Sequence, residues 1–317
     1  MSVIAAILAH LSAPTWAALR NTVVLALIFT LLPRLANVCN RTPAWWRKPD
    51  LSTDLCWAVV PKFLYRITQT VLLVSGIVVC YGIHDPDDIA TFLTEGHGPL
   101  VRLGFCPQVV LYLLGSDLLM YFTHRLFHGH RLWPFHAVHH SSRHVEWISA
   151  TRTHPLDAVL HGGLPDVVML LLGIPLEVLI WILPFNIGSS AAVHANLDWR
   201  FGPLRYVLAS PVFHRWHHTS ASRGGSSNFA GTFAFIDLVF GTFYMPADQH
   251  PDAYGLDDPD FPAGFVGQIL HSFLSHRNRA ADAAGERHPR SEVQHAADTR
   301  IADPHAVNTG ALAGEGP

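Results

Sequence analysis

Charged residues are scarce in this sequence. Asp, Glu, Lys and Arg make up only 14% of the 317 residues, whereas soluble domains contain about 25%. Half of the residues are hydrophobic, so the composition indicates a membrane protein. The formal net charge of −3 shows no basic excess, and we therefore expect no nucleic-acid partner.

Cysteines are few and widely spaced. The four cysteines are Cys39, Cys56, Cys80 and Cys106, and none forms a C-x-x-C pair. This spacing predicts free thiols in a reducing compartment, not a disulfide framework or a thiolate metal site. The sequence also lacks a phosphate-binding glycine loop and any motif for flavin, haem or an iron–sulfur cluster, so redox chemistry would need an external electron donor.

Long apolar stretches divide the first 193 residues. They cover 3–19, 21–38, 64–83, 100–123 and 156–193. They predict an all-α integral membrane protein with about four to six transmembrane or re-entrant helices. The last stretch could form one span of about 20 residues or a tight hairpin broken at Pro175. The N-terminus has no basic segment and no clear small-residue cleavage site, so we expect no cleavable signal.

Basic residues predict which side of the membrane the loops face. Those between the second and third apolar stretches are Arg41, Arg47, Lys48, Lys62 and Arg66. We therefore expect residues 41–66 to be a cytoplasmic loop. Two crossings then place the acidic "HDPDD" outside and return the chain to the cytoplasm at His124. If residues 156–193 enter the membrane and come back, the segments on either side of that block face the cytoplasm as well.

Histidine is abundant, with 22 residues, and eight of them form three motifs. The motif "HRLFH" contains His124 and His128, "HAVHH" contains His136, His139 and His140, and "HRWHH" contains His214, His217 and His218. Residues three and four positions apart share one face of an α-helix, so each motif presents its imidazoles to a common point. Eight imidazoles exceed the four ligands of a tetrahedral zinc ion, so we predict two metal ions. Imidazole-rich sites suit iron, zinc or copper.

Local signals place the motifs on helices. Ser210 followed by Pro211 predicts an N-cap and a first helical residue just before His214. Pro134 precedes His136 in the same way, and residues 117–128 continue the span before them. The histidine clusters therefore belong to a helical cap at the membrane surface.

Four more residues are candidates for the site. His194 follows the last apolar stretch and is a plausible ninth ligand. Asn196 could accept a hydrogen bond or coordinate through water. Asp117 lies two helical turns before His124 and is either a hydrogen-bond partner of a ligand or an interfacial acid. His154, in "TRTHPLD", is either a ligand or a residue that fixes a loop.

Two further sets of residues have an expected role beyond metal binding. Arginines interleaved with the histidines are interfacial anchors or a docking surface for an acidic electron donor: Arg125, Arg131, Arg152 and Arg215. Leu170, Ile174 and Leu179 are candidates for the wall of a substrate cavity, the alternative being a lipid-facing anchor. We assign no catalytic residue beyond the metal ligands.

These motifs resemble those of the fatty acid hydroxylase superfamily, the sterol desaturase-like membrane di-iron oxygenases. The resemblance covers about residues 100–250 and includes "HRLFHGHRLWPFHAVHH", "FHRWHHTS" and "NFAGTFAFIDLVFGTF". It implies that the eight motif histidines are metal ligands, that His194 is a further ligand and that His154 belongs to an R-x-H-P element. Many relatives have an acidic residue at the position of Ser226, so a hydrogen bond near the site would be missing or supplied elsewhere.

The resemblance implies a membrane enzyme, an oxidoreductase with two iron ions. Such enzymes use O₂ and electrons from NAD(P)H, delivered by a reductase with cytochrome b5 or a ferredoxin, to hydroxylate a sterol, sphingoid base, fatty acyl chain or other lipid. Desaturation is the alternative reaction. A metal transporter would place its ligands near the bilayer midplane, and a zinc hydrolase would need a carboxylate base, for which Glu146 is the nearest candidate.

These expectations divide the chain into four parts. Residues 1–99 contain the N-terminal spans and the basic loop, and residues 100–250 form the hydroxylase-like catalytic domain. Residues 251–275 form an amphipathic segment. Residues 276–317 contain few large apolar residues, which predicts a disordered tail.

Overall fold

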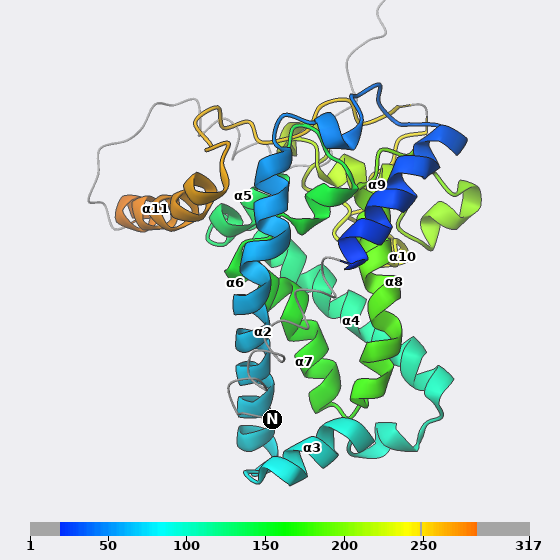
Figure 1. Ribbon diagram of the computed structural model, residues 1–317, viewed down its shortest axis with the longest axis vertical. Helices are drawn as coiled ribbons and strands as arrows, with labels where there is room; N and C mark the ends of the chain where they lie inside the picture. Colours follow the sequence, from blue (N-terminus) through cyan, green and yellow to red (C-terminus); the bar gives the residue numbers. More distant parts are fainter. Residues whose placement is uncertain (1–19, 248, 284–317) are drawn as a thin grey trace, which may run out of the picture. The chain divides into compact units, whose positions relative to one another are not determined.

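The computed structural model describes residues 20–247 and 249–283, which are helical and contain no β-strand (Figure 1). The predicted apolar stretch 3–19 and residues 284–317 of the predicted tail lie outside the described residues. Residues 20–35 form the first described helix, which belongs to the second predicted apolar stretch. The helices considered below belong to one compact unit that ends at His276, except that α11 continues past this residue.

Three of the described helices are long and apolar enough to cross a membrane. They are α2 (Leu51–Tyr81), α4 (Phe105–Phe127) and α8 (Leu176–His194). Their outward faces carry large apolar side chains, and Val79 and Trp181 are 82% and 68% exposed. Such surfaces are stable against lipid and unfavourable in water, so this part of the chain is an integral membrane protein.

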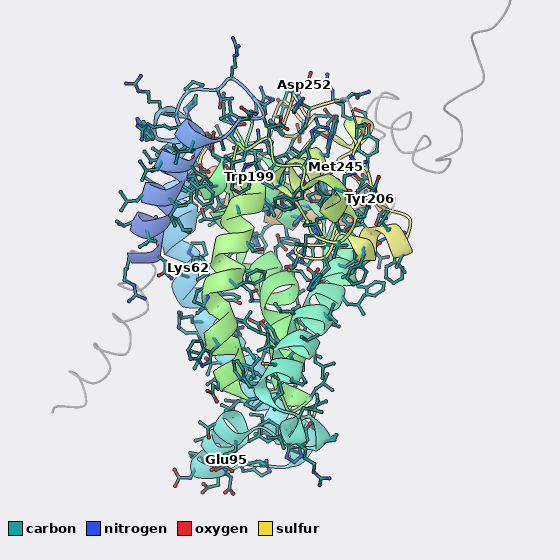
Figure 2. All side chains as sticks on the ribbon, turned by 90° about the vertical axis from the view of Figure 1, so that its right-hand side faces the viewer. Lys62, Glu95, Trp199, Tyr206, Met245 and Asp252 are labelled. Carbon is teal, nitrogen blue, oxygen red and sulfur yellow. The ribbon has the colours of Figure 1, made fainter. Side chains whose placement is uncertain are left out.

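Helix α2 is longer than a membrane requires. Its 31 residues extend about 46 Å, whereas the hydrocarbon core is about 30 Å thick. The surplus lies at the start of the helix, where Trp57 is buried and its indole N–H donates to Gln268 Oε1 at 2.8 Å. The prediction that residues 41–66 are a loop is therefore wrong after Asp50. Lys62 lies part-way along α2, as Figure 2 shows.

Residues 155–194 form a helical hairpin. One continuous helical segment comprises α6 (Pro155–Asp157), the π-helix η4 (Ala158–Gly163) and α7 (Leu164–Leu171). The chain turns at Gly173, whose φ of +103° suits glycine and where a Cβ atom would collide with the His97 carbonyl oxygen. Pro175 then forms the N-cap of α8. Of the two predicted alternatives, the structure has the hairpin broken at Pro175.

The bundle has two distinct ends (Figures 1 and 2). Helix α3 (Pro86–Glu95) and η2 (Pro99–Arg102) lie at the end that carries Glu95. The opposite end, here called the cap (residues 128–152 and 195–247), carries most of the histidine motifs. Short helices of the cap are α5 (Trp133–His140), η3 (Trp147–Thr151), η5 (Gly202–Tyr206), α9 (Pro211–His217), η6 (Ala221–Arg223) and α10 (Phe235–Val239). Helices η1 (Trp45–Arg47) and α11 (Phe265–Ala283) complete the described elements, and α11 continues past the predicted start of the tail at residue 276.

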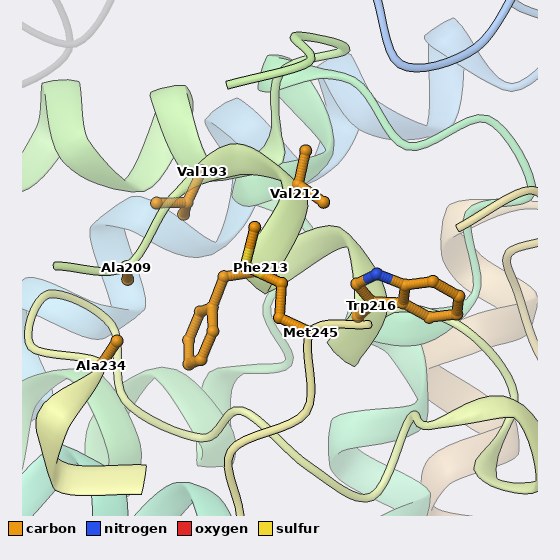
Figure 3. Close-up of a cluster of buried hydrophobic side chains, with 7 residues drawn as sticks. All are labelled: Val193, Ala209, Val212, Phe213, Trp216, Ala234 and Met245. Atoms are coloured by element: carbon orange, nitrogen blue, oxygen red, sulfur yellow. The ribbon is translucent and has the colours of Figure 1, made fainter. Parts of the chain in front are cut away.

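An apolar cluster under α9 fixes the position of that helix. Phe213 is fully buried among Val193, Ala234 and Met245, which come from α8, the start of α10 and the loop after it (Figure 3). The opposite face of α9 is then free to present its histidines to the interior of the cap.

Candidate metal centre

The structure gathers the nine predicted ligand histidines into two groups. The five-His group contains His124, His128, His136, His140 and His217. The four-His group contains His139, His194, His214 and His218. Within each group the candidate ligand nitrogens lie within 4.8 Å of one another. A metal shell with bonds of about 2.1 Å has ligand–ligand separations up to about 4.2 Å, so each group is only slightly wider than the shell of one ion.

The elements that present these histidines follow the sequence signals. His124 and His128 lie at the cap end of α4, and His194 is the last residue of α8. Ser210 is the N-cap of α9, where its hydroxyl accepts from the Phe213 amide at 3.2 Å, and Pro211 is the first helical residue, as predicted. Each H-x-x-H-H motif contributes histidines to both groups, because its neighbouring histidines point to different sides of a short helix.

Hydrogen bonds fix the tautomers in the five-His group. The Nδ1–H of His124 donates to the Phe229 carbonyl at 2.8 Å, and that of His217 donates to the Ser227 carbonyl at 2.7 Å. His136 Nδ1 lies 2.8 Å from Asp157 Oδ2. Carbonyl and carboxylate oxygens only accept, so each Nδ1 carries the proton and each Nε2 carries a lone pair.

The four-His group is fixed in the same way. The Nδ1–H of His139 donates to the Arg152 carbonyl at 3.0 Å, and that of His194 donates to the Ser190 carbonyl at 2.7 Å. Both Nε2 atoms therefore carry lone pairs directed into the group.

These tautomers test whether the sites fit metal ions. His124 Nε2 lies 3.0 Å from His136 Nε2, and His194 Nε2 lies 3.2 Å from His139 Nε2. Two lone pairs that face each other at this distance repel and cannot form a hydrogen bond. The Nε2 atoms of His128 and His217 are buried without any hydrogen-bond partner. A cation between the nitrogens would satisfy all of these atoms, so both groups fit a metal ion.

Protonated imidazoles do not explain the short contacts between Nε2 atoms. Burial lowers the pKa of His136, His140 and His217 well below the usual value near 6.5, and neighbouring histidines lower it further. Burial likewise lowers the pKa of His139 to about 4. These imidazoles are therefore neutral at physiological pH, which is the form that binds metal.

Comparison with known proteins places this site in a family. The family model described as fatty acid hydroxylase matches residues 109–242. A very-long-chain aldehyde decarbonylase of Oryza sativa subsp. japonica is 31% identical over 241 residues, which cover 70% of this chain and 75% of the relative. The chain belongs to the fatty acid hydroxylase family.

Other relatives match over shorter segments. An ornithine lipid hydroxylase of Rhizobium tropici is 34% identical over 52% of this chain and 50% of its own length. The alkylglycerol monooxygenase of Homo sapiens is 32% identical over 46% of this chain and 32% of its own length. The chain thus spans about half of the first relative and about a third of the second. No solved structure matches the chain.

In this fatty acid hydroxylase family member, two buried carboxylates shape the loop that faces the five-His group. Asp117 accepts the backbone N–H groups of Gly231, Thr232 and Phe233 at 2.7 to 3.3 Å. Asp237 accepts those of Phe229 and Ala230, both at 2.8 Å. The loop is therefore held so that its carbonyls meet the histidines. Asp117 is 2% exposed and bonds no histidine, so it has neither of its two expected roles, the partner of a ligand or an interfacial acid.

A buried ion cluster supports the four-His group. Lys48 Nζ lies 2.6 Å from Asp54 Oδ2, and the Arg152 guanidinium pairs with both Asp54 and Asp50. Lys48, Asp54 and Arg152 are almost completely buried. Because the Arg152 carbonyl accepts from His139, this cluster connects the first turn of α2 to a candidate ligand.

Two of the predicted accessory residues lie outside both groups. Asn196 donates to the Asn40 carbonyl at 2.8 Å and accepts from the Asn40 amide at 2.9 Å, so it holds the loop before η1. His154 is the N-cap of α6, where its Nδ1 accepts from the Leu156 amide at 3.2 Å. His154 thus fixes a loop, which was the second of its two expected roles.

Two of the four arginines that were expected at the surface are buried. Arg152 and Arg215 are 1% and 0% exposed, so the expectation that they anchor at the interface or dock a partner is wrong. Arg125 and Arg131 are exposed and stay candidates. Ser226 is exposed as well, and the neighbouring Ser227 carbonyl, not a side chain, accepts from His217.

Two of the three candidate cavity residues belong to or pack against one apolar cluster. Ile174 is 1% exposed and belongs to a cluster with Tyr112 and Val178, against which Leu179 packs. Leu170 is 5% exposed but is not a member of that cluster. The turn between α7 and α8, next to Ile174, lies at the same end of the bundle as α3 (Figure 1). A lining role for these three residues stays a prediction.

Sequence reasoning missed two residues beside the histidines. Asp157 is 1% exposed and pairs with His136, although its position in "HPLDAV" gives no metal-site signal. His161 lies in the π-helix η4, and its ring centroid is 4.6 Å from that of His124. Neither residue shares a helix with a motif, so no sequence spacing could reveal the contact.

Proposed function

We propose that this protein is a membrane-bound di-iron oxygenase that hydroxylates a lipid. The observation that carries the proposal is the pair of histidine groups, in which unprotonated nitrogens face each other without a hydrogen-bond donor. Nine imidazole ligands without a carboxylate suit two iron ions, and family membership favours iron over zinc or copper.

The reaction balances as RH + O₂ + 2e⁻ + 2H⁺ → ROH + H₂O, in which a C–H bond breaks and a C–O bond forms. Bound iron supplies the capacity to reduce O₂ and to oxidise an unactivated C–H bond. The residues of this chain supply the surroundings. The carbonyls of Phe229, Ser227 and Arg152 and the carboxylate of Asp157 orient the imidazoles, and burial of the groups excludes bulk water.

A lipid substrate is supported by the position of the groups at the end of an apolar bundle and by the relatives. Two of those named above are described as hydroxylating an ornithine lipid and oxidising an alkylglycerol. Hydroxylation is favoured over desaturation because both of these names denote oxygen insertion. The rice relative, described as an aldehyde decarbonylase, shows that the family also contains another reaction.

An external donor completes the scheme. We expect electrons from NAD(P)H to arrive through a reductase and cytochrome b5 or a ferredoxin. The exposed Arg125 and Arg131, at the end of α4 and in the loop before α5, are suited to an acidic partner protein.

The cap faces the cytoplasm in this proposal, and the protein crosses the membrane several times. Helix α3 lies at the opposite end of the bundle from the cap (Figure 2). In a background in which the four natural cysteines are replaced by Ser, Arg131→Cys should react with a membrane-impermeant maleimide only from the cytoplasm. Asp88→Cys, on α3, should react only from outside. Labelling of both positions from one side would contradict the topology.

Metal analysis with O₂ uptake tests the function. The purified protein should contain two iron ions per chain and should consume O₂ when a reductant and a lipid extract are supplied, with a new alcohol in the lipid fraction. One zinc ion per chain with no O₂ uptake would favour the alternative hypothesis of a zinc hydrolase. An alkene product would replace hydroxylation by desaturation.

A further inference from the structure

The π-helix η4 separates two parts of one helix that contact different parts of the protein. Before it, Asp157 pairs with His136 of the five-His group. After it, α7 packs between the spanning helices α2 and α4. A single π-turn inside an α-helix is rare and is found mostly at functional sites, because it shifts the faces of the two halves by about one residue, or about 100°. The segment between the two halves carries His161.

His161 lies against the five-His group without belonging to it. Its ring centroid is 4.6 Å from that of His124 and 6.0 Å from that of His136. The first distance equals that between two members of the group, 4.6 Å between His140 and His217. His161 is partly buried, as is His128 of the group, whereas the other four members are buried. His161 therefore stands at the edge of the group, on the segment that leads into α7.

A hydrogen bond fixes the tautomer of His161. Its Nδ1 lies 3.2 Å from the hydroxyl oxygen of Thr123 on α4. That hydroxyl donates its one hydrogen to the carbonyls of Leu119 and Met120, at 3.1 and 3.0 Å. Thr123 must then accept from His161, so Nδ1 carries the proton and Nε2 has a lone pair. His161 thus has the same tautomer as the candidate ligands, but its nitrogen is outside their group.

We propose that His161 is a positioning residue that accepts a hydrogen bond, through Nε2, from a water molecule or substrate hydroxyl next to the five-His group. An apolar lipid chain alone would not need an imidazole at this edge, whereas a small oxygen-containing molecule would be oriented by one. This inference rests on the proposed function, because it assumes iron in the five-His group.

The test uses a matched pair of amides in the full-length, iron-loaded protein. His161→Gln places an amide oxygen near the position of Nε2, and His161→Asn places its amide near Nδ1 and leaves the Nε2 position empty. The probe is azide, a small anion that displaces water from ferric iron, titrated by absorbance. Both variants should retain two iron ions. His161→Asn should change the azide dissociation constant by about fivefold, the effect of one hydrogen bond, and His161→Gln should stay near the wild type.

Two further variants separate positioning from folding. Thr123→Val removes the group that orients the imidazole and should move azide binding in the same direction by a smaller factor. Deletion of Gly162 should convert the π-turn to α-helix and reproduce the effect of His161→Asn with iron retained. Unchanged azide binding in His161→Asn would overturn the inference, even if thermal stability changes. Loss of one iron ion would overturn it as well, since His161 would then be a ligand. Absence of iron in the wild type would instead contradict the proposed function.

Discussion

The five-His and four-His groups are built from the same motifs but have different electrostatic surroundings. The five-His group has a carboxylate, Asp157, on one of its histidines. The hydrogen-bond acceptors found for the four-His group are carbonyls, and the buried Arg215 guanidinium donates to the His194 carbonyl at 3.2 Å. A nearby negative charge favours a bound cation, and a nearby positive charge disfavours it. We therefore expect the five-His group to bind its ion more tightly than the four-His group.

The largest effect should come from removing one ligand from either group. His217→Ala, in the five-His group, and His139→Ala, in the four-His group, should each abolish lipid oxidation and lower iron from two ions to one per chain. The protein should remain in the membrane, because the spanning helices carry insertion. Iron analysis and product formation on the same preparations measure this. Full activity in either variant would show that its group is not part of the catalytic centre.

Neutralising the Asp157 carboxylate should make the metal affinities of the two groups similar. Asp157→Asn should weaken the tighter of the two ions by about 10-fold to 100-fold, the range found when the partner of a ligating histidine is removed. Stepwise competition with a chelator measures the two affinities. Glu146→Gln is the control, since Glu146 is also a buried acid of the cap but bonds none of the nine histidines. An equal effect of both changes would contradict the comparison.

Acid should destabilise the metal-free protein. The pKa of His139 is about 4 in the folded protein and near 6.5 when unfolded, so between these values the unfolded state binds more protons. The free energy of unfolding should therefore fall as the pH decreases from about 6.5 to about 4. Thermal unfolding of chelated protein at several pH values tests this, and His139→Gln should flatten part of the slope. A pH-independent melting temperature would be inconsistent with neutral buried imidazoles.

Charge reversal on the cap should have a moderate kinetic effect. Arg131→Glu should raise the KM for an acidic electron donor by about threefold to tenfold, more at low salt, with little change in kcat. Arg102→Glu is the matched control, since Arg102 is exposed at the opposite end of the bundle. Equal effects of both substitutions would exclude a docking site on the cap.

The smallest effect should come from the candidate cavity wall. Leu179 on α8 lies 15 residues, about 22 Å, from His194 of the four-His group, and Leu170 lies on α7, which leads to the five-His group. Leu179→Trp and Leu170→Trp each add volume at a strain of about 1–3 kcal/mol. A shift in the chain length of the products for only one of them identifies the helix that the lipid follows. Unchanged products for both would make this region an anchor.

The sequence predicted helices and motifs better than contacts. The spacing of the histidines located eight of the nine members of the two groups, the position after the last apolar stretch pointed to His194, and Ser210 and Pro211 predicted the start of α9. Both signals are local, because they depend on the helical repeat and on one cap. Asp157 and His161 were missed because their contacts with the histidines exist only after the hairpin packs against α4.

Charged residues were the least predictable. Lys62 was assigned to a loop because its charge suggested one, yet α2 is long enough to include it. Arg152 and Arg215 were expected at the surface, but both are buried. Hydrogen bonds from the guanidinium groups to nearby oxygen atoms offset the free-energy cost of burying their charge. Composition alone gives no information on whether a partner for a buried charge will come from a distant segment.

The ion cluster of Lys48, Asp54 and Arg152 joins two segments that the ribosome synthesises at different times. Arg152 follows Asp54 by 98 positions; at about 5–20 residues per second this corresponds to about 5–20 s of translation. During that time α2 is already available for insertion, while Asp54 in its first turn still lacks its partner Arg152. His218 is synthesised later still. Neither histidine group is complete before the last motif has been translated, so metal loading follows the synthesis of that motif.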